Sequence, residues 1–92
     1  MAILQVRQKQ TGSFEEAFSR AQQLLKQRKG YLGHELHKGI EYPDRYLLII
    51  RWETLEDHTE GFRGSPQYQQ WKAMLHHFYE PFPEVVHFNK IY

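Results

Sequence analysis

One segment of this 92-residue chain, RYLLIIRW at residues 45–52, has strand composition and is apolar on both faces of the strand it predicts. Successive side chains of a strand point to opposite faces, so one face carries Tyr46, Leu48, Ile50 and Trp52, and the other carries Leu47 and Ile49. A helical layer covers only one face of such a sheet. We therefore expect a second copy of the chain to cover the other face, which predicts a homodimer.

The residues before this segment predict a strand, a helix and a second strand. AILQVRQ at residues 2–8 has strand composition. Ser13 and Glu16 have capping-box spacing, and the apolar residues that follow recur at helical spacing until Gly30, which predicts a helix over about residues 14–29. Residues 31–40 read as a strand that a turn at residues 41–44 joins to the strand at 45–52.

The residues after the segment predict two helices and a last strand. Thr54 and Asp57 repeat the capping pattern for a short helix, with Leu55, His58 and Phe62 on one face. A second helix begins with Ser65 and Pro66 as N-cap and first residue, and it ends before Pro81 and Pro83. Residues 84–92 have strand composition. The order βαββαβ predicts one α+β domain over residues 1–92, with a ferredoxin-like antiparallel sheet and both helices on one face.

Charge and composition exclude several classes of partner. Twelve Lys and Arg residues oppose eleven Asp and Glu residues, and the signs are mixed along the chain, so we expect neither nucleic acid nor a membrane as a partner. The chain has no cysteine and no apolar run of membrane-spanning length. We expect a cytoplasmic protein.

The six histidines do not have the spacing of a metal site. His34 and His37 point to opposite faces of a strand, and His76 and His77 are adjacent on a helix, where both lie off the apolar stripe. We expect no bound metal and a solvated surface position for these four histidines.

Five other residues are candidates for a binding site. The short helix turns His58 toward the sheet, where it is either a core histidine bonded to a backbone carbonyl or a functional group. Gln5 is a polar side chain in an apolar strand. It either forms a hydrogen bond inside the fold or at a subunit contact, or it binds the substrate. The aromatic side chains of Trp52, Phe62 and Trp71 are core residues that would also suit a planar aromatic guest.

The stretch GYLGHELHKGIEYPDRYLLIIRWETLEDHTEGFRGSPQY resembles the antibiotic biosynthesis monooxygenase family. The resemblance rests on the Gly-Tyr strand opening, the hairpin, and the Trp-Glu-Thr corner before a split helix. It implies a ferredoxin-like dimer whose two sheets form a shared α+β barrel, in agreement with the strand that is apolar on both faces.

The resemblance implies different residues for different branches of the family. In cofactor-independent, quinone-forming members, a tryptophan ending the third strand lines the site, and Trp52 matches it. His58 stands in place of a tyrosine, and Leu48 replaces an asparagine. In haem-degrading members, an asparagine matches Gln5, a pocket tryptophan falls near Gly61 or Phe62, and the haem-ligating histidine falls near Trp71, so that set is absent.

Together these observations predict a cofactor-independent monooxygenase acting on a phenolic or polycyclic aromatic compound. His58 would be the catalytic base or hydrogen-bond donor near neutral pH. Trp52, Phe62 and Trp71 would hold the ring, and Gln5 would hold a carbonyl or peroxy oxygen. The alternative is a non-catalytic dimer of the same fold that binds a small molecule or serves as an interaction module.

Overall fold

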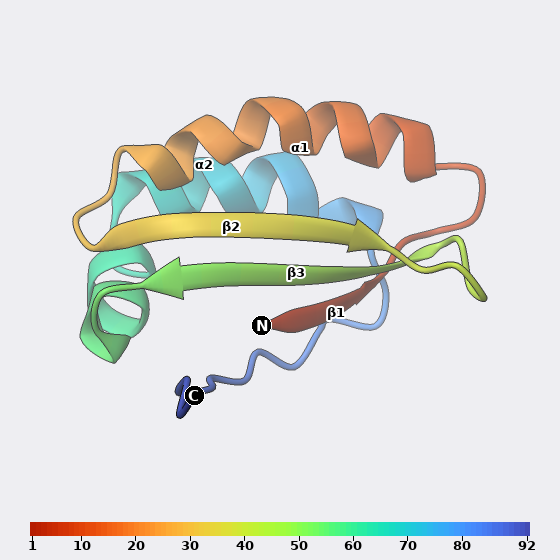
Figure 1. Cartoon of the computed structure of the whole chain (residues 1–92). Coiled ribbons are helices and arrows are strands. Elements are labelled where there is room, and N and C mark those ends of the chain that lie inside the picture. The colour runs from red at the N-terminus through yellow and green to blue at the C-terminus, as the bar shows by residue number, and fades with distance from the viewer.

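The computed structural model describes residues 1–92 and has the predicted α+β architecture, with two helices on one side of an antiparallel sheet (Figure 1). The strands lie in the order β1-β3-β2. The elements are β1 (Ala2–Gln5), α1 (Thr11–Lys26), β2 (Tyr31–Lys38), β3 (Arg45–Trp52), the π-helical turn η1 (Asp57–Phe62), α2 (Pro66–Leu75) and the 3-10 turn η2 (His76–Phe78).

The central strand β3 has the bounds that the sequence predicted. Its side chains alternate as expected: Tyr46 and Leu48 are buried on the helix side, whereas Leu47 and Ile49 are half-buried on the other. The core also contains Leu4 and Val6 from β1 and its continuation. From α1 it takes Phe14, Ala17, Phe18, Ala21, Leu24 and Leu25.

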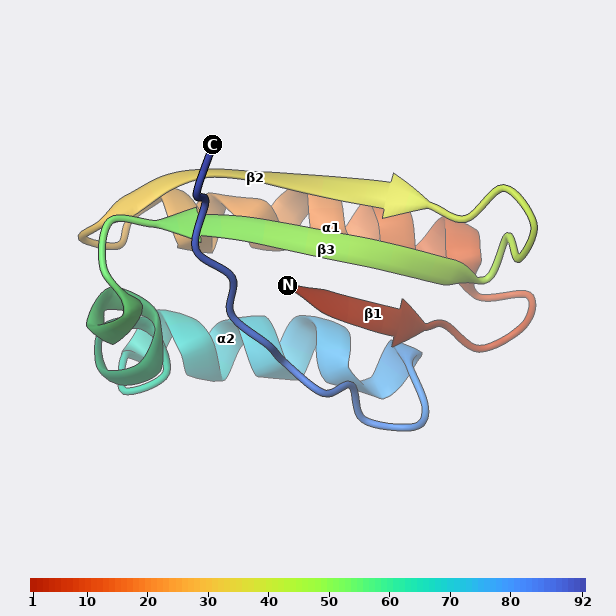
Figure 2. The ribbon, with the colours of Figure 1, turned by 60° about the horizontal axis from the view of Figure 1, so that its bottom comes forward.

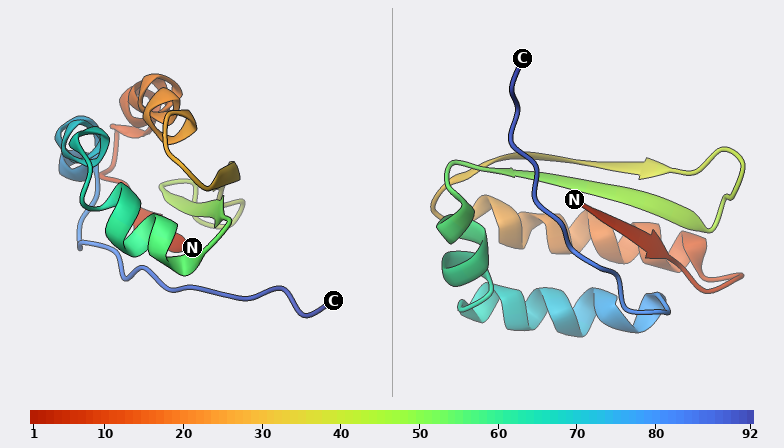
Figure 3. Two further views of the ribbon diagram at one scale, coloured as in Figure 1. Left: turned by 90° about the vertical axis from the view of Figure 1, so that its left-hand side faces the viewer. Right: turned by 90° about the horizontal axis from the view of Figure 1, so that it is seen from below.

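The two faces of the sheet are covered unequally. Both helices lie on the same side, side by side, as the view along the strands shows (Figure 3). On the opposite face no helix covers Leu47 and Ile49, and their neighbour Ile3 is 59% exposed. This face is the one that we expect a second copy of the chain to cover, and the dimer stays a prediction.

The start of α1 differs from the prediction. The helix begins at Thr11 with Gln10 as its N-cap, so Ser13 lies inside the first turn and makes no capping bond. A turn in which Lys9 has a φ of 66° and the Gln10 N–H donates to the Arg7 carbonyl starts the helix early. The helix also ends earlier than residue 29, at Lys26, and β1 is shorter than residues 2–8.

The two later helix starts were predicted correctly. The Asp57 N–H donates to Thr54 Oγ1 at 3.1 Å and the Thr54 N–H donates to Asp57 Oδ2 at 3.2 Å, a reciprocal capping box. Ser65 Oγ accepts from the Tyr68 N–H at 3.2 Å, with Pro66 in the first helical turn. These caps fix the two segments that carry the aromatic residues of the predicted site.

The predicted last strand at residues 84–92 does not form as a regular strand. The chain after η2 returns beside β1 (Figure 2) and touches it at two isolated bridges, Val6 with Tyr79 and Ala2 with Val85. Between them, Pro81 and Pro83 have no N–H to donate, so the ladder is interrupted. We call residues 79–92 the C-terminal segment; its first part occupies the edge position of a fourth strand.

Neither α1 nor α2 combines the length and apolar composition that crossing a bilayer requires, and the same is true of the short turns.

Candidate functional site

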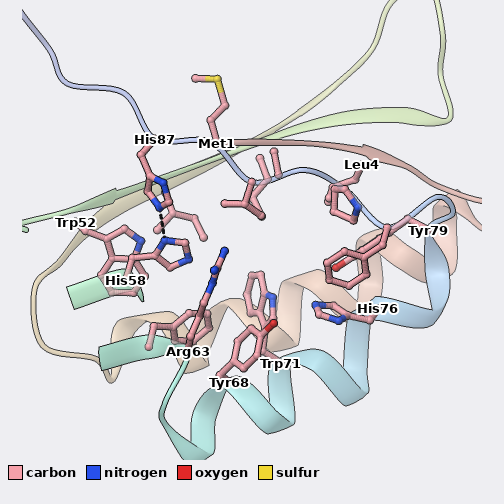
Figure 4. Close-up of a pocket in the computed structure, with 17 residues that line it drawn as sticks. Met1, Leu4, Trp52, His58, Arg63, Tyr68, Trp71, His76, Tyr79 and His87 are labelled. Atoms are coloured by element: carbon pink, nitrogen blue, oxygen red, sulfur yellow. Dashed lines mark hydrogen bonds between the residues drawn. The ribbon is translucent and has the colours of Figure 1, made fainter. Parts of the chain in front are cut away.

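An apolar cavity lies between the sheet, η1, α2 and the C-terminal segment (Figure 4). Its volume is about 310 Å³ and most of its lining side chains are hydrophobic. This volume is at the lower end of the range for small-molecule sites.

The cavity exists because β1 pairs with only part of β3. The β1 ladder runs from Gln5 opposite Arg45 to Ala2 opposite Leu48, whereas β2 pairs with β3 as far as Trp52. The helix-facing side chains of Ile50 and Trp52 therefore stand beside an unpaired strand edge. His58 from η1 and His87 from the C-terminal segment lie over this gap (Figure 4).

The three aromatic residues predicted to hold a ring come together in the cavity wall. The Trp52 and Phe62 ring centroids are 5.6 Å apart, and those of Phe62 and Trp71 are 5.8 Å apart at an interplanar angle of 82°. Phe62 and Trp71 are almost fully buried, and Trp52 is half-buried. This arrangement offers both ring faces and ring edges to a planar aromatic molecule.

His58 points toward the sheet, as predicted. Its ring stacks on Trp52 with centroids 5.7 Å apart and an interplanar angle of 12°. Its Nδ1 is hydrogen-bonded to Nε2 of His87 at 2.8 Å, so its partner is a second imidazole and not a backbone carbonyl. One ring must donate and the other accept, and at least one of the two imidazoles is therefore neutral while this bond exists.

The electrostatics of the cavity bear on the predicted role of His58. Burial lowers its pKa to about 4, with further contributions from the positive charges of Arg63, His87 and the Met1 amino group. The expectation that His58 acts as a base or hydrogen-bond donor near neutral pH stays a prediction, and the low pKa specifies which form of the ring would do so. It is a neutral imidazole at pH 7, and a weaker base than a solvated histidine.

A second polar group of residues lines the other end of the cavity (Figure 4). The His76 and Tyr79 rings have centroids 5.6 Å apart, and those of His76 and Tyr68 are 6.0 Å apart. Burial raises the pKa of Tyr79 well above its usual value and lowers that of His76. His76 Nδ1 is buried and has no hydrogen-bond partner.

Two sequence predictions on this site were wrong. Gln5 does not line the cavity, so its predicted role in substrate binding is wrong: it lies on the other face of β1 from Leu4, and its Oε1 accepts from Arg45 Nε at 3.4 Å, which is the alternative hydrogen bond within the fold. Leu55 is 51% exposed: it precedes the π-helical turn η1 and does not share the face of His58 and Phe62.

The sequence reasoning also missed three residues of the site. His76 was placed on the solvated face, but α2 tightens into η2 at this residue, which turns the side chain into the cavity wall. Arg63 lies at the C-cap of η1, and His87 lies 29 positions from its partner. A helical projection places neither of them. No group of three or more metal-ligating side chains comes together.

Comparison with known proteins places this chain in a family. The model of the antibiotic biosynthesis monooxygenase family matches residues 1–74. The protein YczJ of Bacillus subtilis (strain 168), described as uncharacterised, is 51% identical over 90 residues, which cover 98% of this chain and 95% of YczJ. The chain belongs to the antibiotic biosynthesis monooxygenase family.

Solved structures of family members share the fold. A crystal structure from Bordetella bronchiseptica, assigned to the antibiotic biosynthesis monooxygenases, superposes with a TM-score of 0.94 at 32% identity and covers 99% of this chain and 93% of its own. A protein with the same assignment from Nitrosomonas europaea has a TM-score of 0.85 at 16% identity, over 99% of this chain and 86% of its own. In the present member of the family, Leu48, Trp52 and His58 all line the cavity.

Proposed function

We propose that the protein is a monooxygenase that oxidises a phenolic or polycyclic aromatic small molecule without a cofactor. The observation that carries this proposal is the cavity of about 310 Å³, in which an imidazole stands beside a wall of aromatic rings. Membership of the antibiotic biosynthesis monooxygenase family supports the reaction class.

The chemistry needs no external reductant when the substrate itself supplies the electrons. An anthrone-like ring loses a proton to give an anion, which transfers an electron to dioxygen. Recombination forms a carbon–oxygen bond as a peroxide. Protonation and cleavage of the O–O bond then leave one oxygen atom on the ring as a carbonyl and release the other as water. The ring methylene provides both hydrogen atoms of that water.

In this scheme the protein binds the ring, accepts the proton and limits the access of water. Trp52, Phe62 and Trp71 hold the ring. Neutral His58 accepts the proton, and its bond to His87, which is exposed, gives that proton a path toward solvent. The low pKa of His58 favours a transient transfer over lasting retention of the proton.

Binding without turnover is the alternative, and one observation favours it. Leu48 gives this part of the cavity an apolar side chain, with no amide that could hold a reacting oxygen. A protein of this kind would bind the same aromatic compounds and consume no oxygen.

Oxygen uptake with an anthrone and with a hydroxynaphthoquinone, with a chelator present and no added flavin, tests the proposal. We expect the wild type to consume oxygen and His58→Ala to be slower by roughly 100-fold or more, the usual contribution of a general acid–base group. His77→Ala, which removes an exposed histidine outside the cavity, is the matched control and should keep full activity. A wild type that binds these compounds and consumes no oxygen would favour the alternative.

A further inference from the structure

Arg63 is a cationic side chain in the cavity wall that has no counter-ion. It lies at the C-cap of η1, and its guanidinium group points into the cavity on the same side as His58 (Figure 4). None of the five ion pairs of the structure involves it. The acidic residues of η1, Asp57 and Glu60, do not line the cavity.

The rest of the cavity wall offers no negative charge either. Its titratable side chains are Arg63, two tyrosines and three histidines, and it contains no Asp or Glu. The charge of Arg63 acts on this space, because it helps to lower the pKa of His58. The cavity is therefore apolar with a positive potential at one end, an arrangement that favours a bound anion.

We propose that the cavity selects aromatic molecules that carry an anionic oxygen group, a carboxylate or an ionised enol, and that Arg63 is the residue that binds this group. A guanidinium group is planar, permanently charged and weakly hydrated, and it forms paired hydrogen bonds with two oxygen atoms. Beside Arg63, the side chains of Trp52 and Phe62 contact the aromatic ring of the bound molecule. The inference rests on the ligand site of the proposed function and is independent of turnover.

Calorimetric titration without oxygen tests this specificity with three bicyclic probes. The first probe, 2-naphthoate, is a carboxylate. The second, 2-hydroxy-1,4-naphthoquinone, is an enol that is ionised at pH 7, and the third, 2-naphthol, is neutral at that pH. We expect at least one anion to bind wild type at least 10-fold more tightly than 2-naphthol. The anion that binds more tightly shows whether the cavity prefers a carboxylate or an ionised enol.

Arg63→Gln should reduce the affinity for the preferred anion by roughly 10-fold to 100-fold, the range of a charge-assisted hydrogen bond, and leave 2-naphthol binding almost unchanged. Arg63→Lys, which keeps the charge and loses the planar fork, should fall between these two proteins. Lys29→Gln removes one exposed positive charge outside the cavity and should bind as wild type does. Thermal melting checks that each variant is folded.

The proposal is overturned if wild type binds the neutral probe as tightly as both anions, or if Arg63→Gln and Lys29→Gln weaken anion binding equally. Because the titration excludes oxygen, a protein that shows the Arg63-dependent preference and no oxygen uptake would retain this inference and lose the monooxygenase proposal.

Discussion

Nδ1 of His58 lies 2.8 Å from Nε2 of His87, and this hydrogen bond joins η1 to the C-terminal segment across the opening of the cavity (Figure 4). The two residues are 29 positions apart in the sequence. The bond places a half-buried imidazole, which stacks on Trp52, in contact with an exposed one.

The first prediction concerns the titration of His58. Burial and the neighbouring positive charges hold its pKa at about 4, so its NMR signals should be those of a neutral ring throughout the range from pH 7 to pH 5. His87→Ala removes part of the cover and one of the charged neighbours, and the pKa of His58 should rise toward 6.5. His37→Ala, an exposed histidine on β2, is the control. A wild-type pKa near 6.5 would contradict the described burial.

The second prediction concerns stability at acid pH. Because the folded-state pKa of His58 is lowered, the unfolded chain binds a proton below pH 6.5 that the folded chain does not bind until about pH 4. The contribution of neutral, buried His58 to the unfolding free energy is fully present above pH 6.5 and is lost as the pH falls from 6.5 to about 4. The loss of unfolding free energy is at most roughly 3 kcal/mol.

His58→Phe keeps a ring against Trp52 and removes the titrating group. Urea unfolding at pH 7 and at pH 4.5 should show a smaller loss of stability for His58→Phe than for wild type. The difference between the two losses should be about 2 kcal/mol. Equal losses in both proteins would mean that other groups, such as His34 and His76, whose pKa values burial also lowers, account for the acid sensitivity.

The third prediction concerns Gly30, which packs against the side chain of Asp57 at the start of η1. Gly30 has a φ of 82°, and a Cβ atom there would clash with Asp57 Oδ2, which accepts a hydrogen bond from the Thr54 N–H in the turn before η1. Gly30→Ala should lower the unfolding free energy by about 2 kcal/mol, because backbone strain adds to the loss of the cap. Gly12→Ala, in open space on α1, should leave stability unchanged or raise it by up to about 1 kcal/mol. Urea unfolding of both variants measures the contrast.

The sequence predicted the parts of the fold that local physics determines. The alternation of RYLLIIRW placed β3 and its two faces, and the caps at Thr54 and Ser65 placed two helix starts. The strand predicted at residues 84–92 does not form. Its composition suits a strand, but a strand also needs continuous hydrogen bonding to a neighbouring strand, here β1. Pro81 and Pro83 interrupt that pairing, so the chain forms bridges only on either side of them.

The site was predictable only where the residues lie on regular elements. Trp52, Phe62 and Trp71 were found because strand and helix periodicity orient them inward. Arg63 and His76 lie at helix ends, where the winding changes from one turn type to another, and simple periodicity fails there. His87 reaches the cavity through a segment without regular structure, so only the folded chain shows its contact with His58.

The last prediction concerns the uncovered face of the sheet. Ile3 is 59% exposed and lies beside Leu47, with Ile49 further along β3, and no helix of the same chain covers them. We expect a second copy to pack its sheet against this face, since contiguous apolar surface of this kind marks an interface. Light scattering at micromolar concentration should then report twice the chain mass of 11.2 kDa.

Ile49→Asp should dissociate this dimer or unfold it, because a buried unpaired charge costs several kcal/mol. Leu55→Asp is the matched control, because it places the same charge on a residue that is 51% exposed. Leu55 precedes η1 and lies away from this face, so the variant should have the same mass as wild type. If Ile49→Asp folds and has the same mass as wild type, the charge lies on a solvent-exposed face, and the sheet-to-sheet dimer is wrong.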